Sequence, residues 1–190
     1  MLIAIVGGIG SGKSVVSRIV GIMGYEVYDC DSRAKRLMDS SHDIKERIRC
    51  EIHAECISGG EIDRKRLAEI VFSDEEALQR LNAIVHTAVR EDLKNWVGER
   101  SKDAVLFVET AILYQSGLDR LVDAVWEVDA PLDLRIERVM ARNSVSREEV
   151  LARIASQDSF VPASVHPSVT HIINDNDQPI LPQIERLVAG

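Results

Sequence analysis

The chain has 190 residues, which is the length of one domain or of one domain with a sizeable insertion. Hydrophobic residues make up 45% of it and charged residues 28%, a composition that excludes disordered, collagen-like and low-complexity chains. Acidic residues outnumber basic ones by 31 to 23, so the net charge is −8. That balance argues against binding to nucleic acid, for which a basic surface is expected.

The apolar runs and the cysteines both favour a protein of a reducing, aqueous compartment. A membrane-spanning helix needs about 18 consecutive apolar residues, and no run in the sequence approaches that length. The apolar run at 1–6 has no basic start and no small-residue cleavage site, so we interpret it as a buried strand and not as a signal peptide. The three cysteines are an odd and sparse set. We therefore expect a cytoplasmic protein without membrane or nucleic-acid partners.

Changes in hydrophobic periodicity predict strands that alternate with helices. In chain order, we first expect a strand at 2–6, a helix at 13–23 and a strand at 26–30, followed by a mostly helical stretch at 32–97 that is broken at Gly59-Gly60. Strands at 103–108 and 122–128 come next, then a helix starting at Pro131 and a helix capped by Ser146 and Glu149 that runs toward Gln157. The chain is expected to end with a loop at 160–168, a strand at 171–174 and a helix at 179–188. The predicted fold class is therefore α/β, with a parallel sheet of about five strands flanked by helices. The stretch 32–97 is too long for one crossover connection, so we expect it to form a helical lobe.

The segment GGIGSGKS at 7–14 matches the phosphate-loop motif G-x-x-x-x-G-K-[ST] in full. An apolar strand precedes it and a helix follows, as the motif requires. Glycines allow backbone N–H groups to surround phosphate oxygens, and the helix N-terminus adds partial positive charge. We expect Lys13 to reach the β- and γ-phosphates of ATP and Ser14 to ligate Mg²⁺. The predicted nucleotide-binding residues are those of this segment from Gly8 onward together with the next residue: Gly8, Ile9, Gly10, Ser11, Gly12, Lys13, Ser14 and Val15.

A phosphate loop identifies a nucleotide but not a reaction. The alternative interpretation of the segment, a glycine-rich turn with an exposed lysine, is disfavoured because motif and context agree. GTPases read their base with an N-K-x-D motif, which the sequence lacks. Kinases of small molecules and ATP-driven machines remain, and the short chain favours the kinases.

Carboxylates end two of the predicted strands. Asp29 and Asp31 stand two residues apart, so the period of a strand would place both on one face. Ligands of open α/β sheets bind beyond the carboxyl ends of the strands, where a carboxylate can orient and deprotonate an acceptor hydroxyl. Alternatively, Asp31 caps a helix that begins at Ser32. Glu109 ends the segment VLFVE and is placed either to bind Mg²⁺ through water or to start a helix as an acidic residue.

Five segments, in order along the chain, carry a more specific signal. They are GGIGSGKS, YDCDSRAKRL, IDRKRLAEIVFSDEEALQRLNAIVH, VETAILYQSGLDRLVDAVWEV and RIERVMARNSVSREEVLARIASQ. Together they resemble the dephospho-coenzyme A kinase family over nearly the whole chain. The resemblance implies transfer of the γ-phosphate of ATP to the ribose 3′-hydroxyl of dephospho-coenzyme A. It also implies that Asp31 is the catalytic carboxylate beside that hydroxyl.

Arginines recur on one face of the helix predicted after Pro131. Arg135, Arg138 and Arg142 lie at i, i+3 and i+7. Taken alone, they are more typical of a solvated helix face than of a phosphate-binding one, although arginines are suited to gripping phosphate oxygens. The resemblance implies a lid at about 136–158 in which Arg138 and Arg142 bind ATP. Arg142 is then expected to neutralise charge on the transferred phosphate as a catalytic residue, and lid closure to exclude water.

The helical lobe contains the remaining candidates for binding the acceptor substrate. Arg64 and Arg66 stand at a predicted helix start, where they either contact the acceptor or are solvated; the resemblance favours contact. His86 lies on the long helix predicted at 74–97, where a lone histidine is more often a packing residue. The family has a histidine at this place, usually before a proline, whereas this chain has Thr87.

We therefore predict one kinase domain whose substrates are ATP and dephospho-coenzyme A and which requires Mg²⁺. The expected segments are a core at 1–31, 103–135 and 159–190, an acceptor lobe at 32–102 and a lid at about 136–158. The expected acceptor-binding residues are Asp31, Arg64, Arg66, His86 and Glu109. The protein is expected to be a monomer or a weak homo-oligomer. Two alternatives stay open: a kinase for another small molecule, such as a nucleoside monophosphate, and a nucleotide switch that transfers no phosphate.

Overall fold

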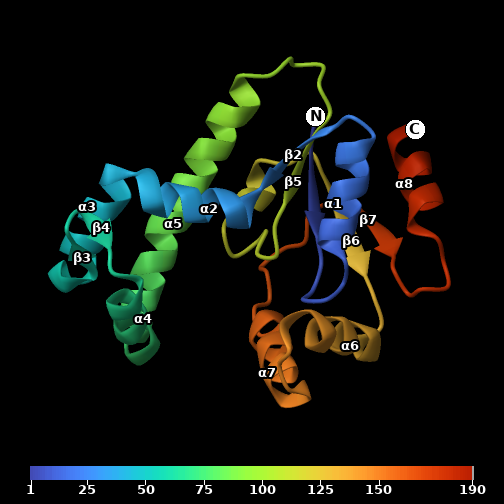
Figure 1. Cartoon of the computed structure of the whole chain (residues 1–190). Coiled ribbons are helices and arrows are strands. Elements are labelled where there is room, and N and C mark those ends of the chain that lie inside the picture. Colours follow the sequence, from blue (N-terminus) through green and yellow to red (C-terminus); the bar gives the residue numbers. More distant parts are fainter. Residues whose placement is uncertain (190) are drawn as a thin grey trace. The chain divides into compact units, whose positions relative to one another are not determined.

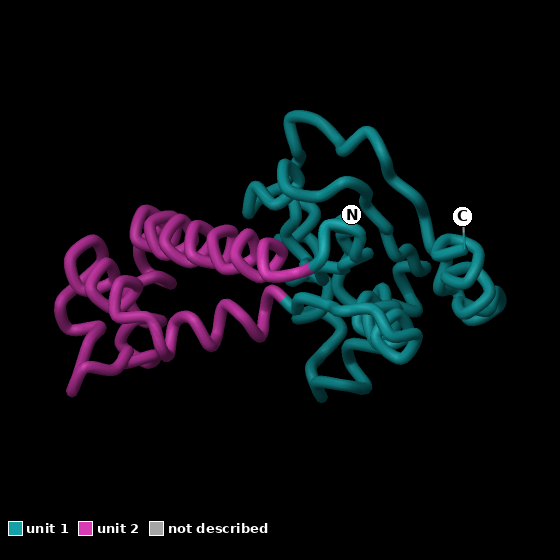
Figure 2. Tube along the Cα trace, turned by 90° about the horizontal axis from the view of Figure 1, so that it is seen from above, with its two compact units in different colours: residues 1–29, 101–190 teal, residues 30–100 magenta. Residues whose placement is uncertain are grey.

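The computed structural model describes residues 1–189 and divides the chain into two compact units. Unit 1 comprises Met1–Asp29 and Ser101–Gly190, and unit 2 comprises Cys30–Arg100 (Figure 2). The assignment of an acceptor lobe and a lid to segments of these units stays a prediction. No helix among the described residues is both long enough and apolar enough to cross a membrane.

A five-stranded parallel sheet forms the centre of unit 1 (Figure 1). Its strands are β1 (Leu2–Val6), β2 (Glu26–Asp29), β5 (Leu106–Glu109), β6 (Ala124–Asp129) and β7 (Val169–Ile173), in the order β2-β5-β1-β6-β7. All residues of the central strand β1 are buried, which explains its uninterrupted apolar sequence. The predicted α/β class with about five parallel strands is therefore confirmed.

Helices α1 (Lys13–Ile22) and α8 (Ile180–Ala189) pack on this sheet and supply its core. Unit 1 also contains α6 (Leu132–Asn143), α7 (Arg147–Asp158) and a 3₁₀ turn η2 at Leu118–Arg120. One cluster of fully buried side chains joins β1, α1, β5 and α8 through Ile5, Val16, Phe107 and Ile184. Each such side chain stabilises the fold by about 1.5–3 kcal/mol relative to exposure. A second cluster joins α6 to α7.

Unit 2 is helical apart from one hairpin. Its elements are α2 (Cys30–Ser40), α3 (His42–Glu51), η1 (Ala54–Cys56), β3 (Ile57–Ser58), β4 (Glu61–Ile62), α4 (Arg64–Ser73) and α5 (Glu75–Gly98). The side chain of Asp74 caps α5 by accepting hydrogen bonds from the N–H groups of Glu76 and Ala77 at 2.9 and 3.1 Å. A core that includes Ile48 and Ile84 packs the other helices of the unit against α5.

The predicted break at Gly59-Gly60 is a β-hairpin turn. Both glycines have positive φ angles, 60° and 83°, which a two-residue hairpin turn requires. The flanking strands β3 and β4 were not predicted, because two residues each are too few to show a period.

The predicted helix starts near the end of the chain are largely correct. Ser146 and Glu149 form the expected capping box at the start of α7. Pro131 is the N-cap of α6 and not its first residue, so that prediction was wrong by one position. Among the strands, β5 and β6 begin later than expected, at Leu106 and Ala124.

An exposed pair at the edge of the sheet makes stability depend on pH. His171 on β7 and the carboxylate of Asp129 on β6 lie 2.6 Å apart. The hydrogen bond to Asp129 raises the pKa of His171 above its ordinary value. Because His171 binds a proton more tightly in the folded chain than in the unfolded chain, its protonation stabilises the fold. This contribution is complete below the pKa of the unfolded chain, about 6.5, and it disappears as the pH rises through the pKa of the folded chain.

His171→Gln should therefore lower Tm by about 1 °C near pH 5.5 and by less near pH 9, because an exposed pair contributes little. Thermal unfolding at both pH values measures the difference. A Tm change of the same size at both pH values would contradict the linkage.

Candidate functional site

The phosphate loop connects β1 to α1 and requires glycine for reasons of space as well as conformation. Gly12, the N-cap of α1, has a φ of +102°, and a Cβ there would lie 2.1 Å from the side-chain nitrogen of Asn174. Gly10 has a φ of +80°, and its Cβ would lie 2.5 Å from the carbonyl oxygen of Arg135. Since the first turn of α1 carries no acidic residue, its partial positive charge is not neutralised locally.

Lys13 and Ser14 stand at the end of this loop. The Lys13 ammonium group donates a hydrogen bond to the carbonyl of Gly7 at 2.8 Å and approaches that of Gly8 at 3.5 Å. Ser14 is exposed in the first turn of α1, as is Val15. The eight predicted nucleotide-binding residues of the motif therefore lie in one continuous loop and helix turn.

Arginines of α6 hold the loop from its outer side. Arg135 donates a hydrogen bond from Nε to the carbonyl of Ile9 at 2.9 Å. Its Nη2 atom is buried against Gly8, and within residues 1–189 it has no hydrogen-bond partner. Arg138 lies 3.5 Å from the carbonyl of Ser11. The predicted one-sided arrangement thus brings Arg135 and Arg138 to the phosphate loop.

Arg142 lies elsewhere in this structure. It is exposed in the last turn of α6 and donates a hydrogen bond to the side chain of Asn143 at 3.1 Å. Its contact with ATP phosphates stays a prediction. Sequence reasoning omitted Arg135 from the site, although its position on the same helix face was a usable signal.

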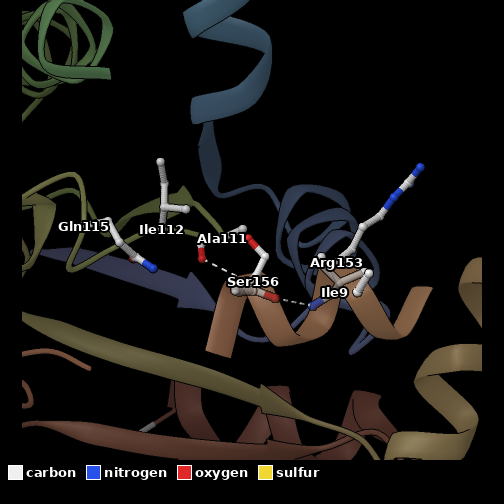
Figure 3. Close-up of a pocket in the computed structure, with 8 residues that line it drawn as sticks. Ile9, Ala111, Ile112, Gln115, Arg153 and Ser156 are labelled. Atoms are coloured by element: carbon white, nitrogen blue, oxygen red, sulfur yellow. Dashed lines mark hydrogen bonds between the residues drawn. The ribbon is translucent and has the colours of Figure 1, made fainter. Parts of the chain in front are cut away.

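Gln157, near the end of α7, links Ile9 of the phosphate loop to Ala111, which follows β5. Figure 3 labels Ile9 and Ala111 and marks hydrogen bonds with dashed lines. The side-chain oxygen of Gln157 accepts a hydrogen bond from the N–H of Ile9 at 2.8 Å, and its nitrogen donates to the carbonyl of Ala111 at 3.1 Å. Both bonds lie beside a cavity of about 570 Å³, within the range of small-molecule sites. The cavity lining includes Ile112, Gln115 and Ser156. Gln115 therefore lines a space large enough for part of a ligand.

Two acidic residues meet at the carboxyl edge of the sheet. Glu109 is the last residue of β5 and is in register with Asp29, the last residue of β2, and with Ile5 on β1. Because the phosphate loop follows β1 directly, the Glu109 backbone lies at the same sheet edge as the start of the loop.

The predicted placement of Asp31 was wrong. Strand β2 ends at Asp29 and α2 begins at Cys30, so no loop separates them and the two-residue period stops there. Asp31 is an exposed side chain within the first turn of α2, and it is neither on the strand nor the cap before Ser32. Its catalytic role stays a prediction.

The acceptor-binding candidates of unit 2 have local partners. Arg64 pairs with Asp39 at 2.5 Å, and Arg66 pairs with Glu55 at 2.6 Å. Both pairs are exposed and contribute little to stability. His86 is half-buried on α5, and burial, with the nearby Arg90 charge, lowers its pKa, so its imidazole is neutral at pH 7.

Comparison with known proteins gives a consistent picture. A sequence model of the dephospho-CoA kinase family matches residues 1–180. A dephospho-CoA kinase of Porphyromonas gingivalis is 39% identical over 186 residues, covering 98% of this chain and 92% of that protein. One of Bacteroides fragilis is 36% identical over 187 residues, covering 98% and 91%.

Solved structures agree with these matches. A Thermus thermophilus protein superposes with a TM-score of 0.80 and 34% identity, covering 100% of this chain and 96% of that one. A dephospho-CoA kinase from Campylobacter jejuni has the same fold, with a TM-score of 0.70, 24% identity and coverage of 99% and 95%.

Proposed function

The chain belongs to the dephospho-CoA kinase family, and we propose that its phosphate loop, Asp31 and the arginines of α6 transfer the γ-phosphate of ATP to the ribose 3′-hydroxyl of dephospho-CoA. The observation that carries the proposal is the complete phosphate loop, with Lys13 held against the Gly7 carbonyl at 2.8 Å. Membership of the family indicates dephospho-CoA as the acceptor, and the phosphate loop accounts for the use of ATP as the phosphate donor.

The proposed reaction is a direct, in-line transfer. The 3′-oxygen of the acceptor forms a bond to the γ-phosphorus while the bond from that phosphorus to ADP breaks. The hydroxyl proton passes to the carboxylate of Asp31, which also orients the oxygen. Lys13, with Arg138 and Arg142, stabilises the charge on the phosphate oxygens, so most of the rate enhancement comes from positioning and electrostatics.

The donor set fits a magnesium ion. Ser14 and Glu109 offer hard oxygen ligands, and Mg²⁺ in kinases typically takes one or two protein oxygens, with the rest from phosphates and water. We therefore propose that these two residues hold Mg²⁺, directly or through water. When bound, the ion neutralises charge on the β- and γ-phosphates.

The acceptor side of the site is assigned from the family resemblance. We propose that Arg64, Arg66 and His86 contact dephospho-CoA; the arginines would then exchange exposed carboxylate partners for the substrate. The lid at 136–158 would close over ATP. We further propose a cytoplasmic monomer or weak homo-oligomer that binds these two small molecules.

ADP release tests the function directly. With ATP and Mg²⁺, the wild type should release ADP when dephospho-CoA is present, and much less with AMP, adenosine or no acceptor. Lys13→Ala serves as the blank. The product should carry a new 3′-phosphate.

Two other outcomes would each point to one of the alternative functions. Release with AMP alone would make the protein a different small-molecule kinase. ATP binding without release to any acceptor would make it a nucleotide switch.

A further inference from the structure

Asn174, the residue directly after β7, touches the phosphate loop from a position far away in the sequence. It is 8% exposed, and its backbone N–H donates a hydrogen bond to the carbonyl of Asp129 at 2.7 Å, continuing the pairing of β7 with β6. Its side-chain nitrogen donates to the carbonyl of Ser11 at 2.7 Å. Its side-chain oxygen accepts from Nη2 of Arg138 at 3.1 Å. Since a carbonyl only accepts and a guanidinium only donates, these partners fix the orientation of the amide.

The Ser11 carbonyl needs such a donor. When the N–H groups of a phosphate loop face an anion, its carbonyls face outward, and each one needs a partner in the surrounding protein. For Ser11, Asn174 provides the short bond, whereas Arg138 lies at 3.5 Å. The Asn174 nitrogen lies so close to Gly12 that a Cβ there would come within 2.1 Å. The amide therefore supports the turn from which α1 and Lys13 begin.

The same amide also positions a cation without neutralising it. Besides Asn174, Arg138 donates to the side-chain oxygen of Asn176 at 2.7 Å. Within residues 1–189, the hydrogen-bond acceptors of Arg138 are neutral amide and carbonyl oxygens. Neutral acceptors fix the direction of a guanidinium group and leave its full charge to attract phosphate, which a carboxylate would not do.

We infer that Asn174 is a positioning residue for ATP, which holds the phosphate loop through the Ser11 carbonyl and orients Arg138 beside it. Asn174 acts through these two groups, because its side-chain nitrogen bonds to the Ser11 carbonyl and its side-chain oxygen bonds to Arg138. The inference rests on the proposed function only in taking ATP as the phosphate donor.

Two substitutions separate this role from a merely structural one. Asn174→Asp keeps the size of the side chain and an acceptor for Arg138, but it loses the donor to Ser11 and places a negative charge against the arginine. Asn174→Ala loses both bonds and leaves Arg138 charged. If Asn174 only stabilised the fold, the near-isosteric Asp variant would be the milder one. If it positions ATP, the Asp variant should bind ATP more weakly than the Ala variant, although its Tm is the same or higher.

Asn174→Asp should raise KM for ATP about tenfold or more, and KM for dephospho-CoA less than about twofold. Gln183→Ala is the matched control, because Gln183 holds both backbone groups of the preceding residue, Ile173, at 2.9 Å without touching the loop. It should lower Tm and leave both KM values unchanged.

Titration of ATP without any acceptor keeps this test separate from the proposed function. Weaker ATP binding by Asn174→Asp supports the inference even if the acceptor proves to be another molecule. An ATP affinity equal to that of the wild type, or one that falls in step with Tm across the three variants, would overturn it.

Discussion

Lys13→Ala should lower kcat by about 10²–10³-fold, because it removes a fixed positive charge from the oxygens that gain charge in the transition state. The KM for ATP should rise as well, since the ammonium also attracts the phosphates before reaction. In the structure this group is held by the carbonyls of Gly7 and Gly8, so it is already placed at the loop. Steady-state ADP release at saturating acceptor measures both constants.

Arg18→Ala is the matched control for this variant. Arg18 is a second cation of α1, exposed and one turn beyond the phosphate loop. Its removal changes the net charge by the same amount but should leave kcat within about twofold. A kcat for Lys13→Ala close to that of Arg18→Ala would show that the loop lysine does not assist transfer.

Asp31→Asn should reduce kcat by about 10²–10⁴-fold while ATP still binds. Asparagine keeps the size of the side chain but cannot take the proton of the acceptor hydroxyl. ADP release and ATP titration on the same protein separate the chemical step from nucleotide binding. A kcat lowered together with ATP affinity would point to a misfolded site, and normal turnover would remove Asp31 from the mechanism.

The alternative role of Asp31, as an acidic residue that stabilises a helix start, has its own control. Asp43 occupies the first turn of α3 in the same way. Asp43→Asn should lose a comparable interaction with the helix dipole, about 0.3–1 kcal/mol, without loss of turnover. If both variants lose only stability, Asp31 serves the helix and not the reaction.

Local signals predicted the phosphate-loop half of the site from the sequence. The buried strand β1, the glycines and the following helix obey rules that act within a few residues, so motif and fold agreed there. The prediction that Asp31 lies on the strand was wrong because the alternation of buried and exposed side chains in β2 continues past the end of that strand. Tyr28 and Cys30 are buried and Asp29 and Asp31 exposed, which reads as a two-residue period, although the backbone turns helical at Cys30.

Contacts between distant segments were beyond sequence reasoning. Arg135 meets Ile9, and Asn174 meets Ser11, across more than a hundred residues of chain. No pattern within a few residues of sequence predicts which donor will form a hydrogen bond with which outward-facing carbonyl of the phosphate loop. The usable hint was general: Asn174 follows a parallel strand, at the edge of the sheet where ligands bind.

The strand order has a consequence for synthesis on the ribosome. The central strand β1 pairs with β5 and β6, so its first partner on β5 is Leu106 and its first partner on β6 is Ala124. At about 5–20 residues per second, the nascent chain carries an apolar strand without its neighbours for on the order of ten seconds. The core of unit 2, in contrast, is complete once Arg100 has been made. The first strand is therefore the apolar strand that waits longest for its neighbours while the chain is being made.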